Sequence, residues 1–154
     1  QYNPVEGQYF LELLGDLSEP VYAKVYQTLY VGAGDLLSGW AAFDSGEEGT
    51  KYADNAYVNI YNASNNQIAQ PWYDTDFGKG EEYCTPWTEW SWTANIAGSY
   101  KIEFGVANGV LDDETNPYAL FDGVTQTVIP EPATMLLLGS GLLGLLGFRK
   151  KRKV

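Results

Sequence analysis

The chain has 154 residues and a formal net charge of −11, yet its cations are unevenly distributed. Five of the nine Lys and Arg residues lie in 149–153, so residues 1–148 carry a net charge of −16. Such an acidic body presents no basic patch to a phosphate backbone, which excludes nucleic acid as a partner. The chain also contains no His, which excludes Ser-His-Asp triads, Cys-His pairs and His-ligated zinc.

Residues 1–129 are expected to form one all-β domain. Short runs rich in β-branched and aromatic residues are separated by turn residues, and none has helical periodicity. We therefore expect about eight strands in a β-sandwich or barrel. Within residues 56–61, alternation places Tyr57, Asn59 and Tyr61 on one face and the apolar residues on the other. The expected strands cover residues 9–14, 22–31, 36–43, 56–61, 68–72, 87–94, 99–107 and 118–128.

Two connections between these strands differ in character. Residues 62–67 are rich in Asn and predict a hairpin loop. Residues 74–86 are acidic and contain two Gly residues, so we expect a long exposed loop there. This loop holds Cys84, the only cysteine, which therefore has no internal disulfide partner. We expect its thiol to be buried and inert, the alternative being a free thiol that bonds to another chain.

Aromatic residues gather around this acidic segment and suggest a sugar-binding site. Trp90 and Trp92 are two residues apart, so they share one face of a strand, whereas Trp87 lies on the other. Exposed rings can stack on the apolar faces of sugars while polar neighbours orient the hydroxyl groups. Because they flank the loop, Trp72 and Trp87, with Tyr73, are the better candidates for carbohydrate contact. The alternative is that most of these rings pack inside the sandwich.

Carboxylates offer the remaining route to catalysis. A pair of Asp or Glu side chains roughly 5–10 Å apart can hydrolyse glycosides, and Glu81, Glu82 and Glu89 are candidates. In a chain with 20 acidic residues, however, such neighbours arise by chance. We therefore expect no enzyme and no catalytic residue.

Oxygen-rich turns raise the question of a metal ion. Ca²⁺ takes six to eight oxygen ligands, and Asp112, Asp113 and Asp44 lie in acidic turns that could supply some of them. None of these turns has the spacing of an EF-hand. We therefore expect the protein to require no cofactor, the alternative being a structural Ca²⁺ ion.

The last 25 residues have three distinct parts. Pro130-Glu131-Pro132 is followed by an uncharged, Leu-rich run over residues 133–148. As a helix this run would extend roughly 24 Å, slightly less than the hydrocarbon core of a bilayer at about 30 Å. The cations directly after it favour a short transmembrane helix with its C-terminus in the cytoplasm over a buried core helix. These cations are Arg149, Lys150, Lys151, Arg152 and Lys153.

This arrangement over residues 130–154 resembles the PEP-CTERM sorting signal, and residues 130–139 are similar to it in detail. The resemblance implies a bacterial envelope protein that an exosortase, a membrane transpeptidase-like enzyme, recognises and processes near Pro130-Glu131-Pro132. It also implies an association with exopolysaccharide production. The protein would first be anchored in the inner membrane with its body outside the cytoplasm, and would then reach the cell surface or the extracellular space.

The body carries a second resemblance. Residues 4–10, 34–40, 98–106 and 118–122 resemble jelly-roll domains that often precede PEP-CTERM signals. In that family a strand usually comes before residues 4–10, so we expect the chain to begin inside the domain, leaving one sheet edge exposed.

Together these features predict an exported surface or matrix protein. Its jelly-roll-like β-sandwich would have a structural or adhesive role in a polysaccharide-rich biofilm matrix. The alternative is a carbohydrate-binding module that uses exposed Trp and Tyr rings, and a glycoside hydrolase comes third.

Overall fold

Eight antiparallel β-strands make up the part of the chain that the computed structural model describes, which is residues 2–15, 22–46, 53–79, 83–109 and 116–129. Each predicted strand is present, with small changes at the ends. The strands are β1 (Leu11–Leu14), β2 (Ala23–Val31), β3 (Leu36–Asp44), β4 (Asn55–Tyr61), β5 (Gln67–Thr75), β6 (Thr88–Thr93), β7 (Gly98–Ala107) and β8 (Tyr118–Thr127).

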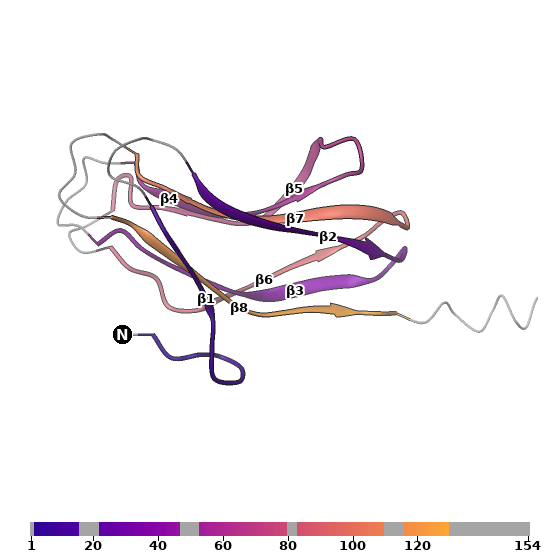
Figure 1. The fold of residues 1–154 in the computed structure, drawn as a ribbon, viewed down its shortest axis with the longest axis horizontal. Helices are drawn as coiled ribbons and strands as arrows, with labels where there is room; N and C mark the ends of the chain where they lie inside the picture. Colours follow the sequence, from indigo (N-terminus) through magenta and orange to yellow (C-terminus); the bar gives the residue numbers. More distant parts are fainter. Residues whose placement is uncertain (1, 16–21, 47–52, 80–82, 110–115, 130–154) are drawn as a thin grey trace, which may run out of the picture.

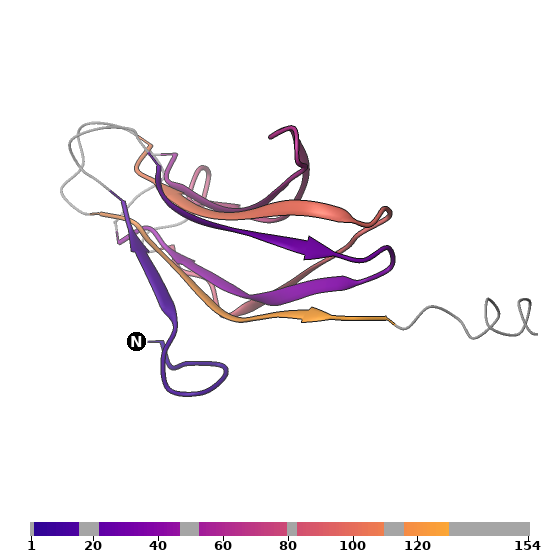
Figure 2. The same ribbon diagram turned by 45° about the vertical axis from the view of Figure 1, so that its right-hand side comes forward.

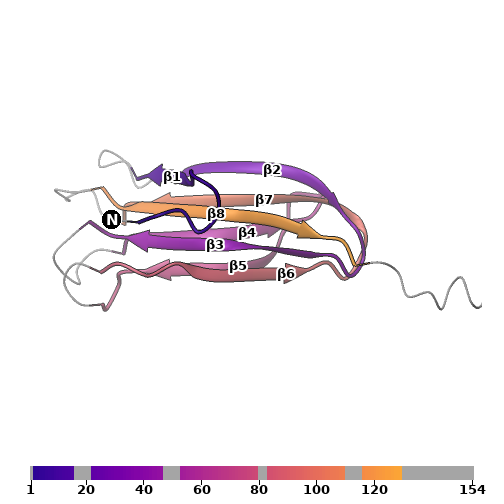
Figure 3. The same cartoon turned by 90° about the horizontal axis from the view of Figure 1, so that it is seen from below.

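The strands form two four-stranded sheets that stack face to face (Figures 1 and 2). One sheet has the order β1-β8-β3-β6 and the other β2-β7-β4-β5. The pairs β1–β8, β2–β7, β3–β6 and β4–β5 therefore nest inside one another, which is the strand order of a jelly roll. Seen from below, β8 lies over β7 and β3 over β4, so the strands of the two sheets run nearly aligned (Figure 3). The prediction of a β-sandwich is confirmed.

Apolar and aromatic side chains fill the space between the sheets. On β4 the inward residues Ala56, Val58 and Ile60 are fully buried, which confirms the predicted division of that strand into two faces. Phe104 of β7 and Phe121 of β8 meet across the sandwich with ring centroids 4.8 Å apart. The predicted shared face of β6 is also correct: Trp90 is buried in this core, and Trp92 packs against it. The two sheets are thus held together largely by burial of apolar area.

The expectation of a long exposed loop over residues 74–86 is correct for residues 77–79, which form an exposed turn, but wrong at its start and at Thr85. β5 continues through Thr75, and Asp76 is only 1% exposed. After residues 80–82, which lie outside the described part, Cys84 pairs with Asp44 in an isolated antiparallel bridge, and Thr85 is buried. The expected burial of Cys84 is wrong as well, because that residue is exposed.

The first residues cross the outer face of the β1-β8-β3-β6 sheet (Figure 1). The hydroxyl of Tyr2 donates a 2.7 Å hydrogen bond to the carbonyl oxygen of Thr85. The amides of Val5 and Glu6 both donate to the carboxylate of Asp122, at 2.6 and 3.0 Å. This segment, residues 2–10, is therefore attached to the domain at both Thr85 and Asp122.

Several expectations fall on residues outside the described part. These are Pro130-Glu131-Pro132, the transmembrane helix over 133–148, the basic residues 149–153, and the candidate calcium ligands Asp112 and Asp113. Within the residues that the structure does describe, no helix is long and apolar enough to cross a membrane. The expected missing first strand likewise stays a prediction.

Candidate functional site

The outer face of the β2-β7-β4-β5 sheet carries the most organised group of polar and aromatic side chains. Strand alternation directs every second residue of β2, β7 and β4 away from the core. The strand register then aligns these outward residues in rows across the sheet. One row runs Tyr26, Glu103 and Asn59, and the next runs Thr28, Lys101 and Tyr61.

Glu103 is the centre of this group. Glu103 is only 4% exposed, and its carboxylate accepts three hydrogen bonds. Tyr57 and Tyr61 donate their hydroxyls to Oε1 at 2.9 and 3.2 Å, and the Lys101 ammonium donates to Oε2 at 3.1 Å. A buried carboxylate is costly unless it is paired and hydrogen-bonded, and here both conditions are met.

The sheet provides room for this network at Gly105. Gly105 lies beside Tyr57 in the register of β4 and β7. A Cβ atom at this position would lie 2.5 Å from Cζ of the Tyr57 ring, closer than real Cβ contacts. The absence of a side chain at Gly105 therefore leaves room for the Tyr57 ring, whose hydroxyl reaches Glu103.

The pKa shifts of Glu103 and Tyr57 keep the first an acceptor and the second a donor of their hydrogen bond. Burial alone would raise the pKa of Glu103, but hydrogen bonds from Lys101 and Tyr57 and the charges of Lys101 and Lys24 outweigh it, so the pKa is lowered. Burial, together with the hydrogen bond to Glu103 and its charge, raises the pKa of Tyr57. At neutral pH the carboxylate is therefore ionised and Tyr57 remains a donor.

Lys101 connects the buried network to the surface. Its Nζ lies 4.0 Å from the ring centroid of Tyr61 and 5.5 Å from that of Tyr26, so the ammonium interacts with both rings. Tyr26 itself is 63% exposed. The result is an accessible aromatic ring held next to fixed charged and hydroxyl groups.

A groove lies beside these residues. Its cavity of about 230 Å³ has Thr28, Ser99 and Lys101 on the sheet and Asn62, Ala63 and Asn65 on the hairpin between β4 and β5, with Tyr100 also lining it. This hairpin rises from the sheet and forms a wall on its outer side (Figures 1 and 2).

Asparagines set the shape of the hairpin, as expected for residues 62–67. The side chain of Asn62 accepts hydrogen bonds from the amides of Ser64 and Asn66, both at 3.0 Å. Asn65 has a φ of 60°, a conformation that Asn tolerates better than most residues. The groove thus presents amide, hydroxyl and ammonium groups next to tyrosine rings, which matches the hydroxyl groups and apolar faces of a sugar.

The predicted carbohydrate residues are not brought together. The expected exposure of Trp72 is wrong, because the residue is 7% exposed and packs against Phe121 in the core. Tyr73 is exposed on the outer face and lies beside Tyr57 in the register. Trp87 lies with the other sheet, where its Nε1 donates to the carbonyl oxygen of Asn3 at 2.8 Å.

The candidate metal ligand within the described residues, Asp44, already has two donors. Its carboxylate accepts from the amide of Gly46 at 3.0 Å and from the hydroxyl of Tyr118 at 2.6 Å. In the part of the chain that the structure describes, no group of three or more His, Cys, Asp or Glu residues is arranged to hold a metal ion.

Comparisons with known proteins address the C-terminal segment most directly. Residues 128–153 match the family model described as the PEP-CTERM protein-sorting motif. The chain therefore carries this motif, as predicted, and the motif indicates an exported protein of the cell envelope. No curated protein matches the chain.

Among solved structures, the chain is similar to one titled "Family 16 Carbohydrate Binding Module-2". The two share 16% sequence identity with a TM-score of 0.45, and the match covers 80% of this chain and 79% of the other. At this level the similarity does not bear on which residues bind a ligand.

Proposed function

We propose that the protein is sorted to the cell surface or the extracellular matrix through its C-terminal segment. An exosortase-type enzyme would recognise Pro130-Glu131-Pro132 and process the chain nearby. Until then residues 133–148 would anchor the protein in the inner membrane, with residues 149–153 in the cytoplasm and residues 1–129 outside it. The match of residues 128–153 to the sorting motif supports this proposal.

The β-sandwich would then act as an adhesive domain without catalysis and without a required cofactor. We propose that its adhesive contact is with a matrix polysaccharide, held in the groove next to Tyr26 and Lys101. The observation that favours this role is the exposed Tyr26 ring beside the fixed Lys101–Glu103 pair. Such a ring can stack on a sugar while its polar neighbours bind hydroxyl groups.

The charge of the protein indicates the kind of polysaccharide. Residues 1–148 carry a net charge of −16, so a polymer rich in carboxylates or sulfates would be repelled. A neutral polysaccharide meets no such repulsion. We therefore propose that the groove binds a glycan without acidic groups, of which a neutral polysaccharide is the first to test.

The groove is tested with the full chain in detergent micelles, titrated with a panel of neutral and acidic polysaccharides by calorimetry. Replacing Tyr26 with Ala should weaken binding of a neutral glycan about tenfold, the loss expected from removing one stacked ring. Tyr9→Ala is the matched control, because Tyr9 is 84% exposed and lies in the N-terminal segment, away from the groove. No binding across the panel, or equal losses in both variants, would contradict the proposal.

A further inference from the structure

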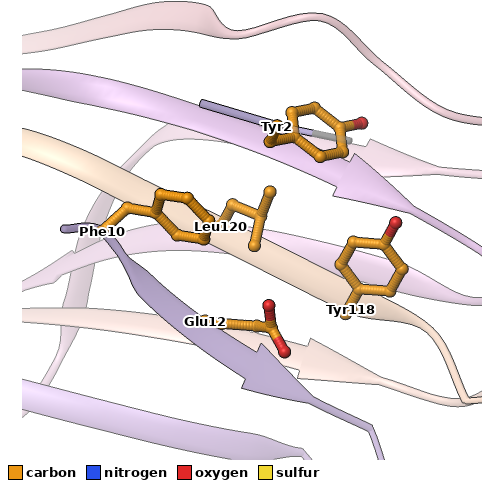
Figure 4. A pocket seen from close by; sticks show the side chains of 5 residues that line it. All are labelled: Tyr2, Phe10, Glu12, Tyr118 and Leu120. Carbon is orange, nitrogen blue, oxygen red and sulfur yellow. The ribbon is translucent and has the colours of Figure 1, made fainter. Parts of the chain in front are cut away.

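A second cavity lies on the opposite side of the molecule, on the outer face of the β1-β8-β3-β6 sheet. It has a volume of about 310 Å³ and is lined by Tyr2, Phe10, Glu12, Tyr118 and Leu120. Figure 4 shows the aromatic rings of Tyr2, Phe10 and Tyr118 around the opening, with the Glu12 carboxylate at one side. A volume near 300 Å³ is at the small end of the range for ligand sites. It suits a single sugar residue rather than a long ligand.

Contacts outside the cavity hold its aromatic walls. The Tyr2 hydroxyl donates to the carbonyl oxygen of Thr85 at 2.7 Å, and the Tyr118 hydroxyl donates to Asp44 at 2.6 Å. Both phenol protons are therefore used in hydrogen bonds to groups that do not line the cavity.

Trp87 packs against two of these rings. Its ring meets those of Tyr2 and Phe10 edge to face, with centroids 5.9 and 5.8 Å apart. Because Trp87 also donates to the carbonyl oxygen of Asn3, the N-terminal segment and the sheet are fixed relative to one another. The cavity is thus formed before any ligand arrives.

The electrostatics of the cavity favour a cation. Glu12 supplies an exposed carboxylate, and the carboxylate of Asp44 accepts the hydrogen bond of Tyr118. Burial and the charge of Asp44 raise the pKa of Tyr2 to about 12, so its ring stays neutral. Among the described residues, the lysines lie elsewhere: Lys101 and Lys24 are on the other sheet, and Lys79 lies over Tyr83.

We propose that this cavity binds the protonated amino group of a hexosamine, with the ammonium between the aromatic rings and the Glu12 carboxylate. Aromatic faces attract ammonium groups, and the carboxylate adds direct charge pairing. The strongly acidic body also raises the local concentration of cations. The choice of a sugar amine over a protein amine rests on the proposed function, whereas the choice of an ammonium group rests on the cavity alone.

The cavity is tested by NMR on the ¹⁵N-labelled full chain in detergent micelles. The probes are glucosamine, N-acetylglucosamine, which lacks the charge, and Nα-acetyl-lysinamide, which carries an amine of protein type. Glucosamine should shift the amide signals of Glu12 and Leu120 and bind about fivefold more tightly than N-acetylglucosamine. Equal binding of the two sugars, or binding of the lysine probe alone, would overturn the proposal.

Two variants separate the charge from the rings. Glu12→Gln and Phe10→Leu should each weaken glucosamine binding about fivefold, the second because it keeps an apolar side chain but removes a π face. Glu89→Gln makes the same charge change as Glu12→Gln at an exposed position of β6, outside the cavity, and should leave the affinity unchanged. Unchanged affinity in Glu12→Gln would contradict the proposal. Loss of polysaccharide binding in Tyr26→Ala reports on the groove, whereas loss of the glucosamine-induced shift at Leu120 in Glu12→Gln reports on this cavity, so failures at the two sites are distinguishable.

Discussion

Replacement of Glu103 by Gln tests whether the buried carboxylate organises the outer face of the β2-β7-β4-β5 sheet. The variant keeps the size of the side chain but removes its charge, so Lys101 loses its ion pair at 3.1 Å. The amide NH₂ of the new Gln side chain would also face one of the three groups that now donate hydrogen bonds to Glu103. A hydrogen bond to a charged group contributes about 1.5–3 kcal/mol, and Lys101 is 21% exposed at its side chain. We therefore expect the free energy of unfolding to fall by about 2 kcal/mol.

The assay is urea unfolding of the full chain in micelles at pH 7, followed by tryptophan fluorescence. Lys101→Met and the double variant complete a mutant cycle, with an expected coupling free energy of about 1–2 kcal/mol. Glu89→Gln, on the exposed side of β6, should change the free energy of unfolding by less than about 0.5 kcal/mol. A loss in Glu103→Gln no larger than in this control, or a coupling near zero, would refute the reasoning.

The pH dependence follows from the sign of the pKa shift. The pKa of Glu103 is lowered in the folded state from an ordinary value of 4.5. Its contribution to stability is therefore present above about pH 4.5 and is lost as the pH falls through the lowered folded-state pKa. The gap in unfolding free energy between the parent protein and Glu103→Gln should narrow over that acidic range. A constant gap down to pH 2 would contradict the assigned shift.

Three further outcomes follow from the structure. Gly105→Ala should destabilise the fold by about 1–3 kcal/mol in urea unfolding, because the new Cβ would lie 2.5 Å from the Tyr57 ring. An unchanged unfolding midpoint would refute this close approach. The pKa of Tyr2 is raised to about 12 from an ordinary 10.0. The contribution of Tyr2 to stability is therefore present below pH 10 and is lost as the pH rises toward 12. A Tyr2→Phe variant should lose less stability than the parent protein over that range. Exposed Cys84 should react with a thiol reagent in the folded protein, and reaction only after unfolding would contradict its exposure.

The fold was largely predictable because its strands carry local patterns. Alternation in residues 56–61 identified the inner and outer faces of β4, and turn residues marked both ends of most strands. The end of β5 was missed. Acidic residues after Trp72 suggested a loop, but β5 runs to Thr75, and alternation within the longer strand turns Trp72 inward and Tyr73 outward.

The polar and aromatic group around Glu103 was less predictable because it depends on the register between strands. Tyr57, Asn59 and Tyr61 were correctly placed on one face, yet nothing local shows that this face adjoins Glu103 and Lys101. Alternation in residues 99–107 puts Lys101 and Glu103 on a shared face. Gly105, which lies on the same face and has no side chain, indicated room there for a neighbouring ring. Only the pairing of β4 with β7 joins the two sets.

The cavity at Tyr2 could not be predicted from the sequence for a similar reason. Its contacts join residues far apart in the sequence, as in the hydrogen bond between Trp87 and Asn3, which are 84 positions apart. Trp87 therefore looked like an exposed ring beside a loop, whereas the N-terminal segment covers part of it.

Mass spectrometry of the mature protein from its native host tests the central claim most directly. If the chain is sorted and processed through its C-terminal segment, the mature protein should end near Pro130-Glu131-Pro132, and peptides from residues 133–154 should be missing. Recovery of the protein at the cell surface with Phe148-Arg149-Lys150 still attached would contradict the account.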